Sequence, residues 1–205
     1  MTEAVGARAR EKTRVRRELV AAALELFERQ GYDRTPVEQI AAEAGVSART
    51  FHRHFPAKMA VVFAPEEELI ARLFTALRRR PADESPLTAL RAAARIVLVG
   101  DQPEWLRPPP VEAQRRTPEL MLANPQLRQQ NFSGIVDWLA TLAEHFAHRA
   151  AHPDDALGLQ LAAAASYGAL SVAFNQWACG TDGSIAAVQR LFDTTLDRLQ
   201  HGVDP

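Results

Sequence analysis

The sequence predicts an all-α protein. Apolar residues recur at spacings of three and four along most of the 205 residues, proline and glycine separate the periodic segments, and no stretch alternates with period two between turn signals. The composition, with 47% hydrophobic and 24% charged residues, is that of an ordinary globular chain long enough to bury a core. It excludes a disordered chain, a collagen-like chain and a disulfide scaffold.

The first predicted helix ends at Gly31 and follows a flexible basic arm at residues 1–12. Residues 1–60 carry a net charge of +3 and the remainder carries −4, so the positive charge is concentrated near the start. A basic arm of this kind is typical of a small polyanion-binding part. The basic residues are Arg8, Arg10, Lys12, Arg14, Arg16 and Arg17, and the apolar face of the helix is formed by Leu19, Ala22, Ala23, Leu26 and Phe27.

The next two segments predict a helix-turn-helix. Residues 35–38 read as a capping box, in which the Thr35 hydroxyl accepts the amide of Glu38 at the start of a short helix. Gly45 suits the positive φ of a tight turn, and Ser47 can cap a second helix that extends to about residue 55. In this arrangement the second helix lies in the major groove of DNA.

The second of these helices separates apolar and polar side chains. Phe51 and Phe55 are four residues apart and share the inner face. The outer face is rich in hydrogen-bond donors that can pair with base edges: Arg49, Thr50 and Arg53, flanked by His52 and His54. Lys58, just beyond Pro56, is placed to meet a backbone phosphate. A solvated polar face is the alternative interpretation.

Residues 14–62 resemble the DNA-binding region of the TetR family of transcriptional regulators. The apolar helix ending at Gly31 and Tyr32, the IAAEAGVS turn, the TFHRHF helix and the trailing lysine occur in the family's order and spacing. His52 departs from the family, which commonly has tyrosine or phenylalanine there. The resemblance implies a homodimer that binds a palindromic DNA operator, with Thr35 capping its helix against a phosphate. The candidate DNA-binding residues are Thr35, Ser47, Arg49, Thr50, His52, Arg53, His54 and Lys58.

The fold class is therefore an N-terminal three-helix, homeodomain-like helix-turn-helix domain plus a C-terminal helical ligand-binding and dimerisation domain. We place the first domain at residues 13–58 and the second at residues 59–205. Acidic Glu66–Glu68 and basic Arg78–Arg80 complement the dipole of one helix after Pro65. Further helices are expected near 86–99, 109–122, 125–151, 153–179 and 184–201, with a loop around Trp105.

The last two predicted helices are candidates for a subunit interface. The last one carries a broad apolar stripe, and the one before it offers small residues that permit close helix approach. The same residues could equally pack inside one subunit, and only the family resemblance favours a dimer. The candidate interface residues are Ala162, Ala169, Ile185, Val188, Phe192, Leu196 and Leu199.

Aromatic residues in the middle helices indicate a core or an effector pocket. The resemblance implies a cavity for a small, largely apolar effector, and the candidate pocket residues are Trp105, Met121, Phe132, Trp138, Tyr167, Phe174 and Trp177. Glu144, His145, His148 and His152 have the spacing of metal ligands on one helix side. Pro153 ends that helix, however, and imidazoles near a helix C-terminus are favoured by the dipole, so we predict no metal and no cofactor.

Taken together, these patterns predict a ligand-responsive DNA-binding regulator, most simply a repressor. The alternative is a helical small-molecule or lipid carrier without DNA binding. The chain has no nucleophile elbow, phosphate loop or paired-cysteine motif, so we predict no enzyme. The single Cys179 and the lack of a secretory signal favour the cytoplasm. The 21 uncharged residues 156–176 are rich in Ala, Gly and Ser, which favours a buried helix over a membrane span.

Overall fold

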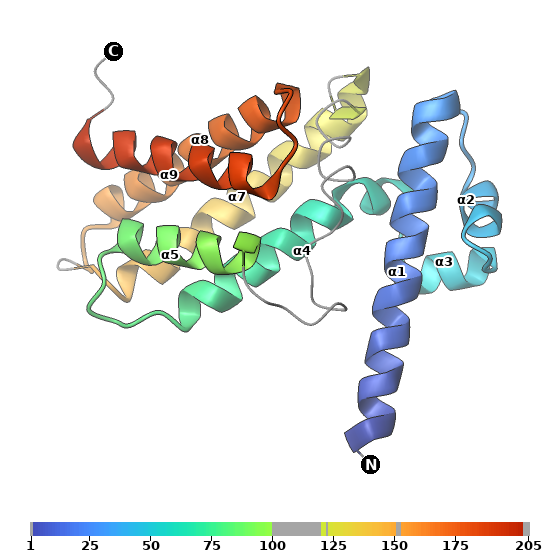
Figure 1. The fold of residues 1–205 in the computed structure, drawn as a ribbon, viewed down its shortest axis with the longest axis horizontal. Coiled ribbons are helices and arrows are strands. Elements are labelled where there is room, and N and C mark those ends of the chain that lie inside the picture. The colour runs from blue at the N-terminus through green and yellow to red at the C-terminus, as the bar shows by residue number, and fades with distance from the viewer. Residues whose placement is uncertain (1, 100–119, 122, 151–152, 203–205) are drawn as a thin grey trace. The chain divides into compact units, whose positions relative to one another are not determined.

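The computed structural model describes residues 2–99, 120–121, 123–150 and 153–202. Within these ranges all regular structure is α-helical, as the sequence predicts. The helices are α1 (Thr2–Gln30), α2 (Val37–Glu43), α3 (Ala48–His54), α4 (Lys58–Arg78), α5 (Pro86–Val99), α7 (Pro125–Ala147), α8 (Ala156–Cys179) and α9 (Ile185–His201) (Figure 1). The expected helix at 109–122 and the loop around Trp105 fall almost wholly outside the described residues.

The chain forms two compact units, and α4 belongs to both, because the boundary lies between Glu68 and Leu69. The first unit holds α1, α2, α3 and the start of α4, together with the described residues of 120–127. Its core is closed by large side chains from all of these segments, including Leu19, Phe27, Ile40, Phe51, Phe55, Val62 and Leu127. The second unit comprises the rest of α4, α5, α7 from Arg128 onward, α8 and α9, and α9 packs against both α8 and α5.

Two element boundaries differ from the sequence prediction. Helix α1 begins at Thr2, so residues 2–12 continue the helix and do not form the expected flexible arm. Helix α4 begins at Lys58 and passes through Pro65, whereas the sequence suggested a helix that starts after the proline. Proline removes one backbone hydrogen bond from a helix interior, but the buried residues Val61 to Ala64 hold the preceding turns in the core.

Helix α8 buries only one of its two apolar faces. Ala163, Ser166, Ala173 and Trp177 are buried, and their spacings of three, seven and four residues place them on one side of the helix. The opposite face leaves Leu157, Leu161 and Val172 at 69%, 61% and 50% exposed. Among the described residues, α8 is the one helix long and apolar enough to cross a membrane by length and composition. Its exposed hydrocarbon calls for a covering partner.

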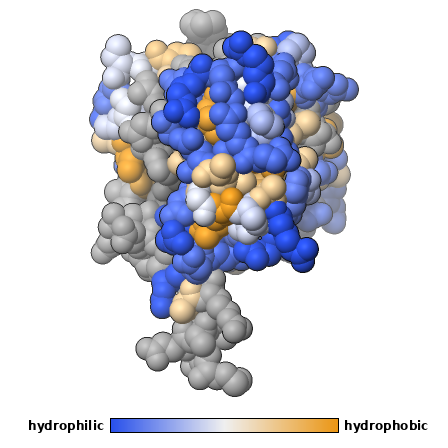
Figure 2. Space-filling view, turned by 90° about the vertical axis from the view of Figure 1, so that its right-hand side faces the viewer, coloured by the Kyte–Doolittle hydropathy of each residue, from blue (hydrophilic) through white to orange (hydrophobic). Residues whose placement is uncertain are grey.

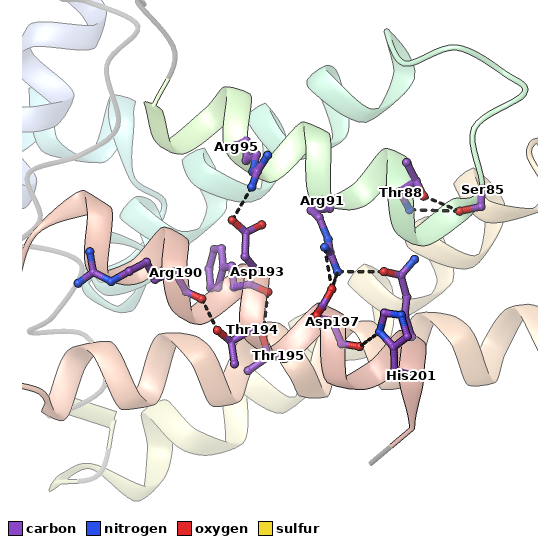
Figure 3. A network of polar contacts seen from close by, with 12 residues as sticks. Ser85, Thr88, Arg91, Arg95, Arg190, Asp193, Thr194, Thr195, Asp197 and His201 are labelled. Atoms are coloured by element: carbon purple, nitrogen blue, oxygen red, sulfur yellow. Dashed lines mark hydrogen bonds and ion pairs between the residues drawn. The ribbon is translucent and has the colours of Figure 1, made fainter. Parts of the chain in front are cut away.

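Helices α5 and α9 are joined at the surface by arginine–aspartate pairs (Figure 3). Arg91 donates to Asp197 at 3.1 Å and to Gln200 at 2.9 Å, and Arg95 donates to Asp193 at 2.8 Å. These pairs fix the register of the two helices. Because each is partly open to solvent, each adds at most about 1 kcal/mol to stability.

Candidate nucleic-acid interface

Helix α3 is anchored by two phenylalanines and capped by a serine. Phe51 and Phe55 are 0% and 1% exposed, and their ring centroids lie 5.6 Å apart inside the first unit. Ser47 Oγ accepts the backbone N–H of Thr50 at 3.1 Å, which satisfies one of the free amides at the helix start. Anchoring from within and capping at the N-terminus fix which side of α3 faces outward.

The outward side of α3 presents cationic and imidazole groups. Arg49, His52 and Arg53 are exposed, and within the described chain no acidic side chain pairs with either arginine. The face over α1, α2 and α3 is hydrophilic around a smaller apolar patch near its centre (Figure 2). Thr50 is half-buried, and its hydroxyl lies 3.1 Å from Ser47 Oγ. The two guanidinium groups keep their full set of donors for an external partner.

The turn between α2 and α3 uses a glycine in the left-handed region. Gly45 has φ +68°, its N–H donates to Ala42 O, and the N–H of Val46 donates to Ala41 O. These two bonds form the Schellman arrangement that ends a helix, and they require the conformation that glycine adopts without strain. Val46 then packs against the core of the first unit. The predicted Gly45 turn is present.

Thr35 does not form the predicted capping box. It is 0% exposed, and its hydroxyl donates to Gly31 O at 2.9 Å and accepts from Gln30 Nε2 at 3.2 Å. The residue before α2 is Pro36, which makes no side-chain cap. The hydroxyl therefore closes the end of α1, where carbonyl groups lack helical partners, and its side chain is not available to a phosphate.

Lys58 is the first residue of α4, and its side chain reaches the turn between α1 and α2. Its ammonium donates to Tyr32 O at 2.8 Å and to Thr35 O at 3.1 Å, and it lies 4.2 Å from the centroid of the Tyr32 ring. Two of its three N–H donors are thus used internally. The predicted phosphate contact is reduced to the third donor, and Lys58 chiefly fastens the start of α4 to the α1–α2 corner.

His54 also differs from its predicted place on the outer face. The side chain is half-buried, and its Nδ1 is buried with no hydrogen-bond partner among the described residues. Burial, followed by the positive charges of Arg53, Lys12 and Arg16, lowers the pKa of His54 below its usual value of 6.5. A neutral imidazole in this position contributes little to the binding of a polyanion.

Half of the predicted basic residues of the N-terminal region are already paired. Arg14 pairs with Glu11 at 2.7 Å and with Glu18, both on α1. Arg16 pairs with Glu67 at 3.6 Å, and Arg17 pairs with Glu68 at 3.4 Å. Arg10 and Lys12 are exposed, and the side chain of Arg8 lies outside the described part. The free positive charge is therefore smaller than the sequence suggests.

The candidate effector residues separate into three groups. Trp105 and the side chain of Phe132 lie outside the described residues, and Met121 packs against the core of the first unit. In the second unit, Trp138 contacts the Phe74 ring at 6.1 Å and the Tyr167 ring at 5.0 Å. Phe174 and Trp177 form a separate pair with centroids 5.2 Å apart. Among the described candidates the structure thus brings together two pairs, Trp138 with Tyr167 and Phe174 with Trp177, and Phe74 also contacts Trp138.

The apolar stripe of α9 packs inside its own subunit. Val188, Phe192 and Leu196 are 3%, 9% and 0% exposed, so these three side chains are buried without a second subunit. The stripe covers α8 and α5, because a helix with one strongly apolar face buries it against its neighbours. Ile185 remains exposed, whereas Ala162, Ala169 and Leu199 are half-buried.

Of the candidate metal ligands, Glu144, His145 and His148 lie within the described residues. His145 Nδ1 donates to Thr141 O at 2.8 Å, and its ring lies 5.0 Å from that of Phe74. His152 lies outside the described residues. Within the described chain no group of three or more His, Cys, Asp or Glu side chains is arranged to hold a metal ion.

Comparison with known proteins places this arrangement in a family. Residues 19–64 match the model of bacterial regulatory proteins of the tetR family, and residues 84–204 match that of the MftR C-terminal domain. The chain belongs to the TetR family. The match to the C-terminal domain covers more than half of its length, so the assignment does not rest on the helix-turn-helix alone.

Individual relatives agree with this assignment. The HTH-type transcriptional regulator TcmR of Streptomyces glaucescens is 46% identical over 93 residues, which span 45% of this chain and 41% of that protein. A protein of Mycobacterium tuberculosis that is named as the mycofactocin biosynthesis transcriptional regulator MftR is 26% identical over 86% of this chain and 88% of its own.

Solved structures share the fold. One is that of FadR from Thermus thermophilus, a TetR family transcriptional repressor in complex with lauroyl-CoA, with a TM-score of 0.53 and 23% identity over 93% of this chain and 95% of that chain. The family models and the named relatives identify this TetR family protein as a DNA-binding transcriptional regulator. Its relatives named above are regulators rather than enzymes.

Proposed function

We propose that this regulator is a repressor that binds a palindromic operator as a homodimer and is released by a small, largely apolar effector. The observation that carries the proposal is the outer face of α3. Arg49 and Arg53 are exposed there without acidic partners in the described chain, while Phe51 and Phe55 anchor the opposite face. Arginine pairs with the O6 and N7 atoms of guanine in the major groove, so two free guanidinium groups on a short helix suit base recognition.

A second copy of the chain is the partner that we assign to the exposed face of α8. This face exposes Leu157, Leu161 and Val172 and carries no charge, which matches an interface in which equivalent surfaces of two subunits meet around a two-fold axis. Two-fold symmetry would in turn present two copies of α3 to half-sites about one helical turn apart. Dimerisation and operator symmetry are thus consequences of the same arrangement.

For the effector we propose the aromatic cluster of Phe74, Trp138 and Tyr167 in the second unit. Trp138 is 7% exposed, and its indole N–H has no hydrogen-bond partner among the described residues. A buried unpaired donor is costly, and an acceptor group on an otherwise apolar ligand would satisfy it. The structurally similar FadR was solved with lauroyl-CoA, which makes acyl compounds a reasonable first set of ligands to test.

Operator binding can be tested without knowing the regulated genes. Random-sequence duplexes are selected on the purified full-length protein, and the enriched sequence is measured by gel mobility shift over a range of salt concentrations. We expect a palindromic sequence bound by two protomers. Failure to enrich any sequence at low salt would refute the DNA-binding proposal and favour the carrier alternative.

The effector proposal has its own test. Acyl-CoA compounds and planar aromatic compounds are added to the preformed operator complex, and release is followed by the same mobility shift. A releasing compound should also quench the fluorescence of Trp138 and should lose potency in the Trp138→Phe variant. A compound that releases wild type and Trp138→Phe equally would contradict this location of the site.

In cells, a reporter behind the operator should be silenced by the protein, and activation would contradict the repressor assignment.

A further inference from the structure

Helix α4 is one of the helices that run from one unit into the other, and it contains a proline shortly before the units divide. Pro65 lies inside the helix and removes one backbone hydrogen bond there. Three consecutive glutamates, Glu66 to Glu68, follow directly, and the boundary between the units comes after them. Helix α4 is therefore one route, beside the start of α7, by which a change in the second unit can reach the first along the described chain.

Arg16 on α1 contacts both this part of α4 and the end of the recognition helix α3. Its Nη2 lies 3.6 Å from Glu67 Oε2. Its Nη1 donates to the backbone carbonyl of His54, the last residue of α3, at 3.2 Å. Its guanidinium carbon lies 4.3 Å from the centroid of the Phe55 ring. One rigid, planar group thus joins the α4 carboxylate to the C-terminal end of α3.

The contacts of Arg16 hold the end of α3 in place but include an ion pair that adds little to the stability of the fold. The Arg16 side chain is 30% exposed and that of Glu67 is 63% exposed, so their ion pair contributes little to the free energy of unfolding. The hydrogen bond to His54 O and the stacking on Phe55, by contrast, act on an orphan helix-end carbonyl and on a fully buried anchor. Removing Arg16 should therefore change the position of α3 more than it changes folding.

We propose that Arg16 is a positioning residue that couples α4 to the recognition helix α3. The proposal rests on the DNA-binding function proposed above and adds its route of regulation. When Glu67 shifts with α4, Arg16 follows its carboxylate, and the end of α3 follows Arg16. The neighbouring pair of Arg17 and Glu68, at 3.4 Å, holds α1 and α4 together at the next position. A small displacement of α4 then changes the angle at which Arg49 and Arg53 meet the bases.

The first test compares two arginines of α1 that differ in their contacts. Arg16→Met keeps the aliphatic stem and removes the charge and the donors. Arg14→Met makes the same change in charge on the same helix, where the arginine is paired only with Glu11 and Glu18 of α1 itself. Affinities of the full-length protein for the selected operator and for an unrelated duplex are measured by mobility shift at one salt concentration.

We expect Arg16→Met to lower the ratio of operator affinity to non-specific affinity by about fivefold or more, within the range of typical coupling between sites. Arg14→Met should lower both affinities equally and leave the ratio unchanged, because only counterion release is lost. Equal ratios in the two variants would overturn the coupling while leaving DNA binding intact. A wild-type protein that prefers no sequence would overturn the proposed function and this proposal with it.

The second test perturbs the α4 side alone and reads the α3 side without DNA. Glu67→Gln removes the exposed carboxylate, and Glu43→Gln, which breaks the 3.5 Å pair with Arg29, is the matched control. The His54 ring is titrated by NMR in each variant. Since Arg16, Arg53 and Lys12 already lower the pKa of His54, freeing Arg16 from Glu67 should lower it further, and Arg16→Met should raise it.

The Arg16→Met, Glu67→Gln double variant completes the test. If Arg16 is the connection, Glu67→Gln should have no effect on the His54 titration or on the operator ratio once Arg16 is absent. Retention of the full Glu67→Gln effect in the double variant would show that α4 reaches α3 by another route and would overturn the proposal.

Discussion

Helix α3 exposes arginines and helix α8 exposes apolar side chains. The sequence predicts which face is exposed in α3, but it does not do so in α8. In α3, two phenylalanines four residues apart stand opposite arginines, so polarity alone identifies the inner and outer faces. In α8, apolar residues occur all round the helix and no charge interrupts them. A helix of uniform polarity has no face that must point inward, so its neighbours decide which side is buried.

The two exposed faces also predict different partners. The outer face of α3 offers hydrogen-bond donors and positive charge, which suit a hydrated polyanion. The outer face of α8 offers hydrocarbon, including Leu157 and Leu161, which suits another apolar surface. The sequence alone therefore identifies the outer face of α3, whereas the exposed face of α8 is identified only from the packing of the helices. The predictions below test each face against a control, from the largest expected effect to the smallest.

The inner face of α3 should carry the largest stability effect. Phe51→Ala removes a side chain that is 0% exposed, and we expect the free energy of unfolding to fall by about 3–5 kcal/mol in urea denaturation followed by circular dichroism. Val136→Ala, at a position that is 56% exposed on α7, should cost less than about 0.5 kcal/mol. A small cost for Phe51→Ala would contradict the anchoring of the recognition helix.

The outer face of α8 should affect assembly. Leu161→Glu places a charge on a surface that we assign to the subunit interface, and we expect self-association to weaken by about 2 kcal/mol or more, roughly 30-fold in dissociation constant. Sedimentation equilibrium measures the change. Ala21→Glu adds the same charge at an exposed position of α1, in the first unit, and should leave the assembly intact. An unchanged dimer in Leu161→Glu would exclude this face from the interface.

The outer face of α3 should affect DNA binding without affecting folding. Arg53→Ala should weaken operator binding by about 1–3 kcal/mol and relax the base preference at one position of each half-site, as measured by mobility shift on single-base variants of the operator. Arg198→Ala removes the same charge from an exposed position on α9 and should leave the base preference unchanged. Unchanged operator affinity in Arg53→Ala would mean that another surface reads the bases.

Removing a helix cap should have the smallest effect on stability, and two caps can be compared. Ser47 Oγ accepts the N–H of Thr50 at the start of α3, and Asp155 Oδ1 accepts the N–H of Gly158 at 2.9 Å at the start of α8. Ser47→Ala and Asp155→Ala should each cost about 1 kcal/mol of stability in thermal unfolding. Only Ser47→Ala should also reduce operator affinity. A reduction of similar size in Asp155→Ala would mean that general destabilisation explains the loss of binding.

The features that sequence reasoning predicted correctly are local ones. The Gly45 turn, the Ser47 cap and the inward Phe51 and Phe55 each depend on residues within a few positions of one another. The bounds of α5 and α9 agree closely with expectation for the same reason. Backbone conformation, capping and side-chain periodicity are determined by near neighbours in the chain.

The features that sequence reasoning missed depend on distant residues. Lys58 donates to Tyr32 O across 26 positions, and Arg16 donates to His54 O across 38 positions. Both acceptors are backbone carbonyls. Since every residue has one, the sequence does not indicate which carbonyl a distant side chain will meet. Thr35 was assigned to the start of α2 by a local motif, but the hydroxyl instead meets Gly31 O at the end of α1. No pattern in the chain distinguishes these outcomes beforehand.

By itself the sequence determined an all-helical chain with a recognition helix whose polar and apolar sides are unambiguous, because helical periodicity and capping act over a few residues. Only the tertiary structure decided which apolar face of α8 stays open, that the stripe of α9 is used within the subunit, and that Arg16 and Lys58 serve internal contacts. Those outcomes depend on which surfaces meet after the helices have formed. The free energy of such a contact depends on both helices that form it, so the sequence of either helix alone does not predict it.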